Sequence, residues 1–167
     1  MPVNIVLVEP EIPQNTGNIA RTCAAIGAEL HLIKPLGFSV DDKYLKRAGL
    51  DYWNLLKVSY YNNFNEFQLS IDNNQIVYVT TKAETVYSDF KYQKNCYLVF
   101  GKETRGIPEE ILFGNKDKCV RIPMVSKARS LNLSNSAAIV AYEAHRQLGF
   151  EGLQKKGHLH RLEWDIP

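Results

Sequence analysis

The chain has 167 residues, of which 45% are apolar and 23% are charged, and its formal net charge is +2. This composition excludes a disordered chain and predicts one globular domain over residues 1–150, followed by a tail over residues 151–167. Such a small net charge also excludes wholesale attraction to nucleic acid, so any such binding depends on local basic groups.

The cysteines and the N-terminal residues indicate the compartment. Cys23, Cys96 and Cys119 are far apart, show no C-x-x-C spacing and lie in apolar segments, so we expect buried thiols in a reducing environment. The first residues carry no basic leader, and their apolar run ends at Glu9, well short of the roughly 20 residues that a membrane span requires. We therefore expect a cytoplasmic protein.

The predicted elements begin with an apolar, β-rich run at residues 3–8. An apolar pattern over residues 16–26 then predicts a helix, with Asn15 or Thr16 as its cap and Gly27 as its end. Further β-rich runs follow at residues 30–34, 55–60, 75–80, 96–100 and 119–122. Their alternation with helix-like or turn-rich segments predicts an α/β fold with a largely parallel sheet.

The last strong helix is expected over residues 134–148, with Ser134 or Asn135 as its cap and Gly149 as its end. The tail that follows shows little periodicity but contains His158 and His160. This pair has no carboxylate or cysteine partner at ligand spacing, so a solvated tail is favoured over a metal site, and no metal is expected.

A glycine loop at residues 101–106 follows the run at 96–100. It falls at the carboxyl end of a predicted strand, where open α/β sheets bind ligands, although a tight turn with positive φ explains its glycines equally well. Ile107 and Pro108 stand where a phosphate-binding loop needs lysine and a hydroxyl residue, which excludes an NTPase. The first run is not followed by G-x-G-x-x-G, which argues against a dinucleotide site.

Polar side chains also gather at two other places. Asn18 and Arg21 are three residues apart on the first helix, and Arg21 needs an anionic partner, for which a carboxylate such as Glu9 and an incoming phosphate are equally favoured. Before the last helix, Ser130 and Asn132 alternate with leucines, which favours a polar pocket wall over a capping role.

Five motifs, in this order, resemble those of the SPOUT superfamily of RNA methyltransferases: Glu9–Arg21, Arg47–Tyr52, Phe100–Gly106, Arg121–Met124 and Ser130–Ser134. The resemblance covers about residues 3–149 and is closest to the small tRNA (cytidine/uridine) 2'-O-methyltransferases of the TrmL or YibK group. It implies an α/β fold with a C-terminal deep trefoil knot, a homodimer, and methylation of the wobble nucleotide, cytidine or modified uridine, at tRNA position 34.

The resemblance also implies a cofactor and roles for single residues. S-adenosylmethionine would be the methyl donor and S-adenosylhomocysteine the product. The cofactor-binding positions would be Val79, Gly101, Glu103, Ile122, Met124, Ser130 and Leu131. Arg21, with Asn15 beside it, matches the arginine at the reacting ribose.

Three further residues are expected to contact RNA: Arg47, Arg129 and Tyr142. For Tyr142, packing at a dimer interface is the favoured alternative, and for Arg47, with Lys43 and Lys46, the alternative is a solvated helix face. Deprotonating a free arginine near neutral pH would cost roughly 7 kcal/mol, so we expect Arg21 to orient the nucleotide through its phosphate.

Two other functions remain open at this stage. The chain could be a knotted module that binds tRNA without modifying it, or a methyltransferase of ribosomal RNA. Larger members that act on ribosomal RNA carry extra RNA-binding domains, for which this chain has no room. A small substrate such as the anticodon stem-loop of tRNA is therefore favoured.

Overall fold

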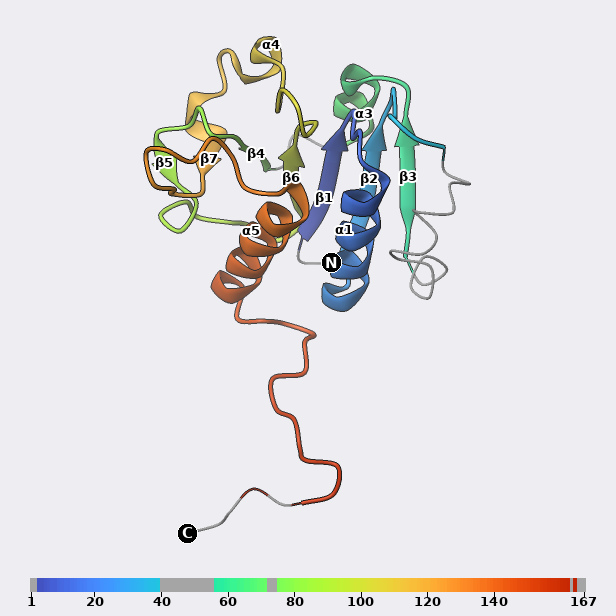
Figure 1. Ribbon diagram of the computed structural model, residues 1–167, viewed down its shortest axis with the longest axis vertical. Coiled ribbons are helices and arrows are strands. Elements are labelled where there is room, and N and C mark those ends of the chain that lie inside the picture. The colour runs from blue at the N-terminus through green and yellow to red at the C-terminus, as the bar shows by residue number, and fades with distance from the viewer. Residues whose placement is uncertain (1–2, 40–55, 72–74, 163, 165–167) are drawn as a thin grey trace.

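The computed structural model describes residues 3–39, 56–71, 75–162 and 164. Seven strands, all paired in parallel, form one sheet in the order β3-β2-β1-β6-β4-β7-β5 (Figure 1). The strands are β1 (Val3–Val8), β2 (Glu29–Ile33), β3 (Val58–Tyr61), β4 (Ile76–Val79), β5 (Thr85–Val86), β6 (Cys96–Phe100) and β7 (Cys119–Arg121). The predicted α/β class and parallel sheet are confirmed.

The six β-rich runs of the sequence all correspond to strands of this sheet. β5 was not predicted, because an element of two residues cannot show a period. β1 lies at the centre and pairs with β2 on one side and with β6 on the other, although β6 is some 90 residues further along the chain. This pairing brings the loop after β1 beside the loop after β6.

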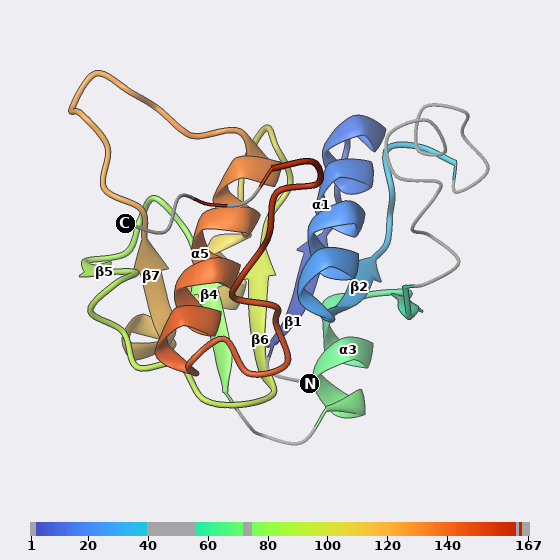
Figure 2. The same cartoon turned by 90° about the horizontal axis from the view of Figure 1, so that it is seen from below.

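Helices cover both faces of the sheet. α1 (Pro13–Ile26) and α5 (Leu133–Gln147) pack against each other on one face, as Figures 1 and 2 show. The short helices α3 (Phe64–Ser70) and α4 (Glu109–Leu112) contribute to the apolar cluster on the other face. Side chains of β1 alternate between the two clusters, since Ile5 faces α1 and α5 whereas Val6 faces α3.

The start of α1 differs from the prediction. The helix begins at Pro13 with Ile12 as its N-cap, and Ile12 has no capping side chain. Pro13 suits the first helical position because its φ is already helical and its missing N–H would have no partner there. Asn15 and Thr16 therefore lie within the first turn, whereas the predicted end at Gly27, with φ 66°, is confirmed.

The cap of α5 also differs from the prediction. Asn132 is the N-cap, and its Oδ1 accepts hydrogen bonds from the backbone N–H groups of Ser134 and Asn135. Ser134 and Asn135 were the predicted caps, but their backbone N–H groups are instead the donors that Asn132 caps. The helix ends at Gln147, and Gly149 follows with φ 71°, as expected for a terminating glycine.

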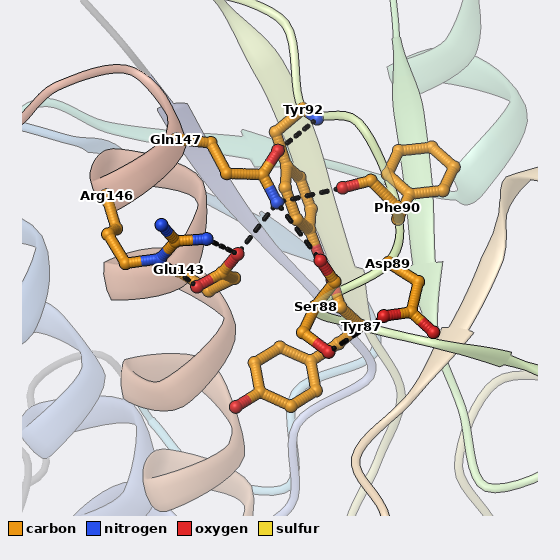
Figure 3. Close-up of polar contacts among 8 residues, drawn as sticks. All are labelled: Tyr87, Ser88, Asp89, Phe90, Tyr92, Glu143, Arg146 and Gln147. Atoms are coloured by element: carbon orange, nitrogen blue, oxygen red, sulfur yellow. Dashed lines mark hydrogen bonds and ion pairs between the residues drawn. The ribbon is translucent and has the colours of Figure 1, made fainter.

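A polar cluster near the C-terminal end of α5 ties this helix to the segment before β6 (Figure 3). Gln147 donates hydrogen bonds to the backbone oxygen of Phe90 (2.9 Å) and to Glu143 (2.7 Å), and accepts one from the backbone N–H of Tyr92 (3.1 Å). Arg146 holds Glu143 from the solvent side with two contacts of 2.8 and 2.9 Å. These contacts hold the C-terminal end of α5 against the segment before β6.

The three cysteines are free and buried, as the sequence predicted. Burial raises the pKa of each thiol, to about 12 for Cys96, so these side chains act as core residues rather than as nucleophiles. None of the helices in the described part of the chain is long and apolar enough to cross a membrane.

Candidate functional site

A pocket of about 540 Å³ lies at the carboxyl edge of the sheet. The ends of three neighbouring strands open into it, through Val79 of β4, Phe100 of β6 and Ile122 just after β7. The first turn of α1 and the segment leading into α5 close its sides. This is the edge at which parallel α/β sheets bind ligands, and the volume is typical of a small-molecule site.

The glycine loop forms one wall of the pocket. Its ends meet in a bridge between Lys102 and Gly106, where the Gly106 N–H donates to the Lys102 carbonyl (2.8 Å) and φ of Gly106 is 69°. A Cβ at Gly101 would lie 2.0 Å from the backbone carbon of Gly106. The sequence left a tight turn and a ligand-binding loop as alternatives, and the structure shows both features. The loop is a tight turn that needs its glycines, and it also lines the pocket.

Complementary charges lock the glycine loop to the loop after β1. Lys102 pairs with Glu9 at 2.6 Å, and Thr104 donates from its hydroxyl to Glu11 at 2.8 Å. Glu9 was one of the two anionic partners considered for Arg21, and its carboxylate is engaged by Lys102. Two acidic residues of the first motif thus contact Lys102 and Thr104 of the second.

Glu103 makes the central connection between these loops. Its carboxylate accepts hydrogen bonds from the backbone N–H groups of Glu11 (2.8 Å) and Ile12 (3.2 Å) and from Nδ2 of Asn15 (2.9 Å). A negative charge is thereby placed at the N-terminus of α1, where the helix dipole favours it. Both oxygens of Glu103 are engaged in this way, so the side chain shapes the pocket by holding the first turn of α1 in place.

Asn15 continues the chain of hydrogen bonds to the third loop. It is 6% exposed, and its Oδ1 accepts from Nδ2 of Asn132 at 2.9 Å. The other end of the Asn132 amide caps α5, and also accepts from the Ser134 hydroxyl at 2.6 Å. Asn132 therefore has both of the roles considered for it, because it caps α5 and lines the pocket.

All seven positions expected to bind the cofactor line this one pocket: Val79, Gly101, Glu103, Ile122, Met124, Ser130 and Leu131. Asn15 and Arg129 line it as well. Other residues also line the pocket, among them Thr80, Thr81 and Lys82, and Phe100 and Arg105 of the Phe100–Gly106 motif. Their common sequence signal is their place directly after β4 or at the glycine loop.

Other predicted site residues lie elsewhere. Arg21 is exposed on α1 and is not part of the pocket lining, because six residues from Asn15 correspond to a rotation of about 240° around the helix. Tyr142 is 45% exposed on α5, also away from the pocket. Arg47, with Lys43 and Lys46, lies outside the described residues. No group of side chains suited to holding a metal ion occurs within the described ranges.

Fold and pocket together define an α/β protein that binds a small ligand at the carboxyl edge of a parallel sheet. The model of the SpoU rRNA Methylase family matches residues 2–142, and the chain belongs to this family.

Two relatives cover nearly the whole chain. A Listeria innocua protein with the provisional name tRNA (cytidine(34)-2'-O)-methyltransferase is 54% identical over 164 residues, which are 96% of this chain and 97% of the relative. The tRNA (cytidine(34)-2'-O)-methyltransferase of Escherichia coli strain K12 is 48% identical over 151 residues, or 90% of this chain and 96% of the relative.

Solved structures agree with these relatives. A structure described as giving insight into 2-OH methylation of C/U34 on tRNA has 42% identity and a TM-score of 0.83, covering 88% of this chain and 96% of that one. An AdoMet-bound rRNA methyltransferase of Sinorhizobium meliloti has 25% identity and a TM-score of 0.78. The match to the latter covers 87% of this chain but only 56% of that one.

Proposed function

We propose that this chain transfers a methyl group from S-adenosylmethionine to the ribose 2'-hydroxyl of the wobble nucleotide, cytidine or modified uridine, at position 34 of tRNA. The observation that carries the proposal is the gathering of all seven predicted cofactor positions in one pocket at the edge of the sheet. Relatives that match this chain over nearly their full length bear the name of this activity.

The pocket suits the cofactor chemically. Val79, Ile122, Met124 and Leu131 offer apolar surface for an adenine ring, and Ser130 offers a hydroxyl. Apolar walls with a few polar groups that fix orientation are what such a ligand requires. When bound, S-adenosylmethionine supplies a methyl group on a positively charged sulfur, so the donor brings its own leaving group.

The protein then has to align the acceptor and handle one proton. In the transfer that the cofactor would supply, the ribose oxygen would bond to the methyl carbon, the carbon–sulfur electron pair would leave with S-adenosylhomocysteine, and the hydroxyl proton would pass to water. Proximity and alignment are the main catalytic contributions. In this proposal Arg21, with Asn15 beside it, holds the nucleotide through its phosphate and polarises the 2'-hydroxyl, while Ser130 and Asn132 shape the site around the methyl group.

A homodimer would bring Arg21 to a pocket. Arg21 lies outside the pocket of its own chain, which supports a site completed by a second protomer. Two apolar side chains of α5 outside the pocket, Ile139 and Tyr142, are exposed by 37% and 45%. Burying this surface against a second copy would explain its exposure, and in that case Tyr142 packs at the interface rather than on RNA.

Three parts of this picture remain predictions: the deep trefoil knot, the cytoplasmic location and the RNA contacts of Arg47 and Arg129. For Arg129, the support is its place in the pocket lining.

The proposal is tested by methyl transfer from labelled S-adenosylmethionine to unfractionated tRNA that lacks this modification. Nuclease digestion and mass spectrometry then identify the methylated nucleoside. We expect 2'-O-methylated cytidine or uridine from position 34. Cofactor binding without incorporation into tRNA, but with incorporation into ribosomal RNA, would overturn the proposed substrate.

The role of Arg21 needs its own measurement. We expect Arg21→Ala to lower the single-turnover methylation rate at saturating tRNA by about 100-fold, since misplacing the reacting groups by about 1 Å can cost that much. An unchanged rate would show that Arg21 does not act at the reacting ribose. Ala25→Ser, on the exposed side of the same helix, serves as the control.

A further inference from the structure

The charges of the pocket are not balanced within the protein. Five charged side chains line it: Lys82, Lys102, Glu103, Arg105 and Arg129. Lys82 pairs with Glu109 at 2.7 Å, and Lys102 pairs with Glu9 at 2.6 Å. Glu103 is engaged by residues 11–15. Arg105 and Arg129 are exposed, and neither pairs with an acidic side chain among the described residues.

The proposed cofactor cannot supply the missing negative charge. S-adenosylmethionine carries a sulfonium, an ammonium and a carboxylate group, so its net charge at neutral pH is positive. Binding it beside two unpaired guanidinium groups adds to the positive charge at the pocket. The polyanionic partner in the proposed reaction is the RNA, whose phosphates carry one negative charge per nucleotide.

We propose that Arg105 and Arg129 bind backbone phosphates on either side of the nucleotide that is methylated. This inference rests on the proposed function and adds Arg105 as a substrate-binding residue. The two arginines come from different loops, Arg105 from the glycine loop and Arg129 from the segment before α5, and both line the same pocket. An RNA strand whose ribose enters this pocket would therefore come close to both.

Guanidinium groups suit this task better than ammonium groups, because they can donate two parallel hydrogen bonds to one phosphate. Phosphate contacts fix the position of a nucleic acid without reading its bases. Arg105 and Arg129 would thus hold the strand in place, while the choice of tRNA depends on other contacts. The Lys102 and Lys82 side chains are not available in the same way, because each already has a carboxylate partner.

The test uses the full chain and an anticodon stem-loop whose target nucleotide is 2'-deoxy, so that binding is measured without turnover. RNA affinity is measured over a range of salt concentrations for the wild type, Arg105→Gln and Arg129→Gln. We expect each variant to bind about tenfold more weakly at low salt, and the slope of log K against log[salt] to fall by about one unit. Arg161→Gln, an exposed arginine of the tail, is the matched control and should change neither quantity.

Cofactor affinity, measured by calorimetry, separates the two anions that the arginines could bind. In the proposed arrangement it changes by less than about twofold in either variant. Weaker cofactor binding with an unchanged salt slope would assign the arginines to the cofactor carboxylate and overturn the proposal. An unchanged slope together with unchanged cofactor affinity would overturn it as well.

Two further measurements keep the result interpretable. Arg105→Lys retains the charge but not the paired donors, so it should keep the salt slope while losing part of the affinity. Wild-type methylation of the unmodified stem-loop is measured in parallel: its absence would count against the proposed function, whereas unchanged slopes in the variants would count against the phosphate contacts alone.

Discussion

Asn15 connects three loops that are far apart in the sequence. Its amide donates to Glu103, 88 residues away, and accepts from Asn132, 117 residues away. These two hydrogen bonds fix the orientation of the amide, since its nitrogen faces a carboxylate and its oxygen faces an amide N–H. A side chain that the sequence favoured as a helix cap is instead held as a link between the walls of the pocket.

Glu103 is the residue on which this link depends. In Glu103→Gln, one carboxylate oxygen becomes an NH₂ group, so at least one of the three donors from residues 11–15 faces another donor. We expect the free energy of unfolding to fall by about 1–3 kcal/mol, the cost of leaving a partly buried donor without a partner.

Urea unfolding of Glu103→Gln measures this cost, with Glu110→Gln as the control. Glu110 is an exposed glutamate of α4, and its substitution should change stability by less than about 0.5 kcal/mol. Equal midpoints for the two variants would show that the carboxylate does not hold the first turn of α1.

Gly101 is constrained by space rather than by φ. The Cβ of Gly101→Ala would overlap the backbone at Gly106 and Ile107, at 2.0 and 2.1 Å, so the glycine loop has to open. We expect unfolding to become easier by about 1–3 kcal/mol and cofactor binding to be largely lost. Calorimetry with S-adenosylmethionine measures this loss. Gly157→Ala, where a Cβ would meet nothing within 4 Å, should bind the cofactor normally.

At the scale of elements, the sequence predicts regular structure well but not its ends. The β-rich runs and the two long helices are confirmed, because periodicity and β-branched content are local properties. α3 and α4 are too short to show a helical period. Both cap predictions were wrong, since Pro13 sets the start of α1 and Asn132 takes the cap of α5.

The attachment of α5 to the segment before β6 depends on Gln147 (Figure 3). Gln147→Ala removes its hydrogen bonds to the backbone of Phe90 and Tyr92 and to Glu143. We expect a loss of about 1–3 kcal/mol in unfolding free energy, because the half-buried Phe90 carbonyl and the buried Tyr92 N–H lose this partner, whereas Glu143 keeps Arg146.

Arg146→Ala provides the comparison for this prediction. Its side chain is 60% exposed, and an exposed ion pair such as that with Glu143 contributes about 0–1 kcal/mol. The thermal unfolding midpoint of Gln147→Ala should therefore be clearly lower than that of Arg146→Ala. The reverse order would show that the ion pair, rather than the amide, holds α5 in place.

At the scale of the whole molecule, the sheet order explains why the site forms. β1 lies between β2 and β6, so the loops that follow β1 and β6 emerge side by side and can exchange hydrogen bonds. No local pattern encodes that neighbourhood. The seven predicted cofactor positions came from a resemblance to a family, whereas Arg105 became visible only once the charges around the pocket could be paired off.

The opposite side of the sheet makes folding sensitive to acid. His31 of β2 is 4% exposed within a group of aromatic rings, and its Nδ1 lies 3.0 Å from the Tyr61 hydroxyl. Its Nε2 has no hydrogen-bond partner in the part of the chain that the structure describes. Burial lowers the pKa of His31 from 6.5 to about 4. Burial also lowers the pKa of His145 on α5, which is fully buried.

The direction of the effect follows from proton binding. Between pH 6.5 and about 4 the unfolded chain binds a proton at His31 and the folded chain does not. The free energy of unfolding is therefore independent of His31 above pH 6.5 and falls as the pH drops below that value. The shift corresponds to a loss of about 3 kcal/mol by pH 4. Urea unfolding at several pH values should show a shallower dependence for His31→Gln than for the wild type. A His31 ring signal that titrates near pH 6.5 in the native state, followed by NMR, would contradict the burial effect, because a folded chain that accepts this proton as readily as the unfolded one gains no acid sensitivity from it.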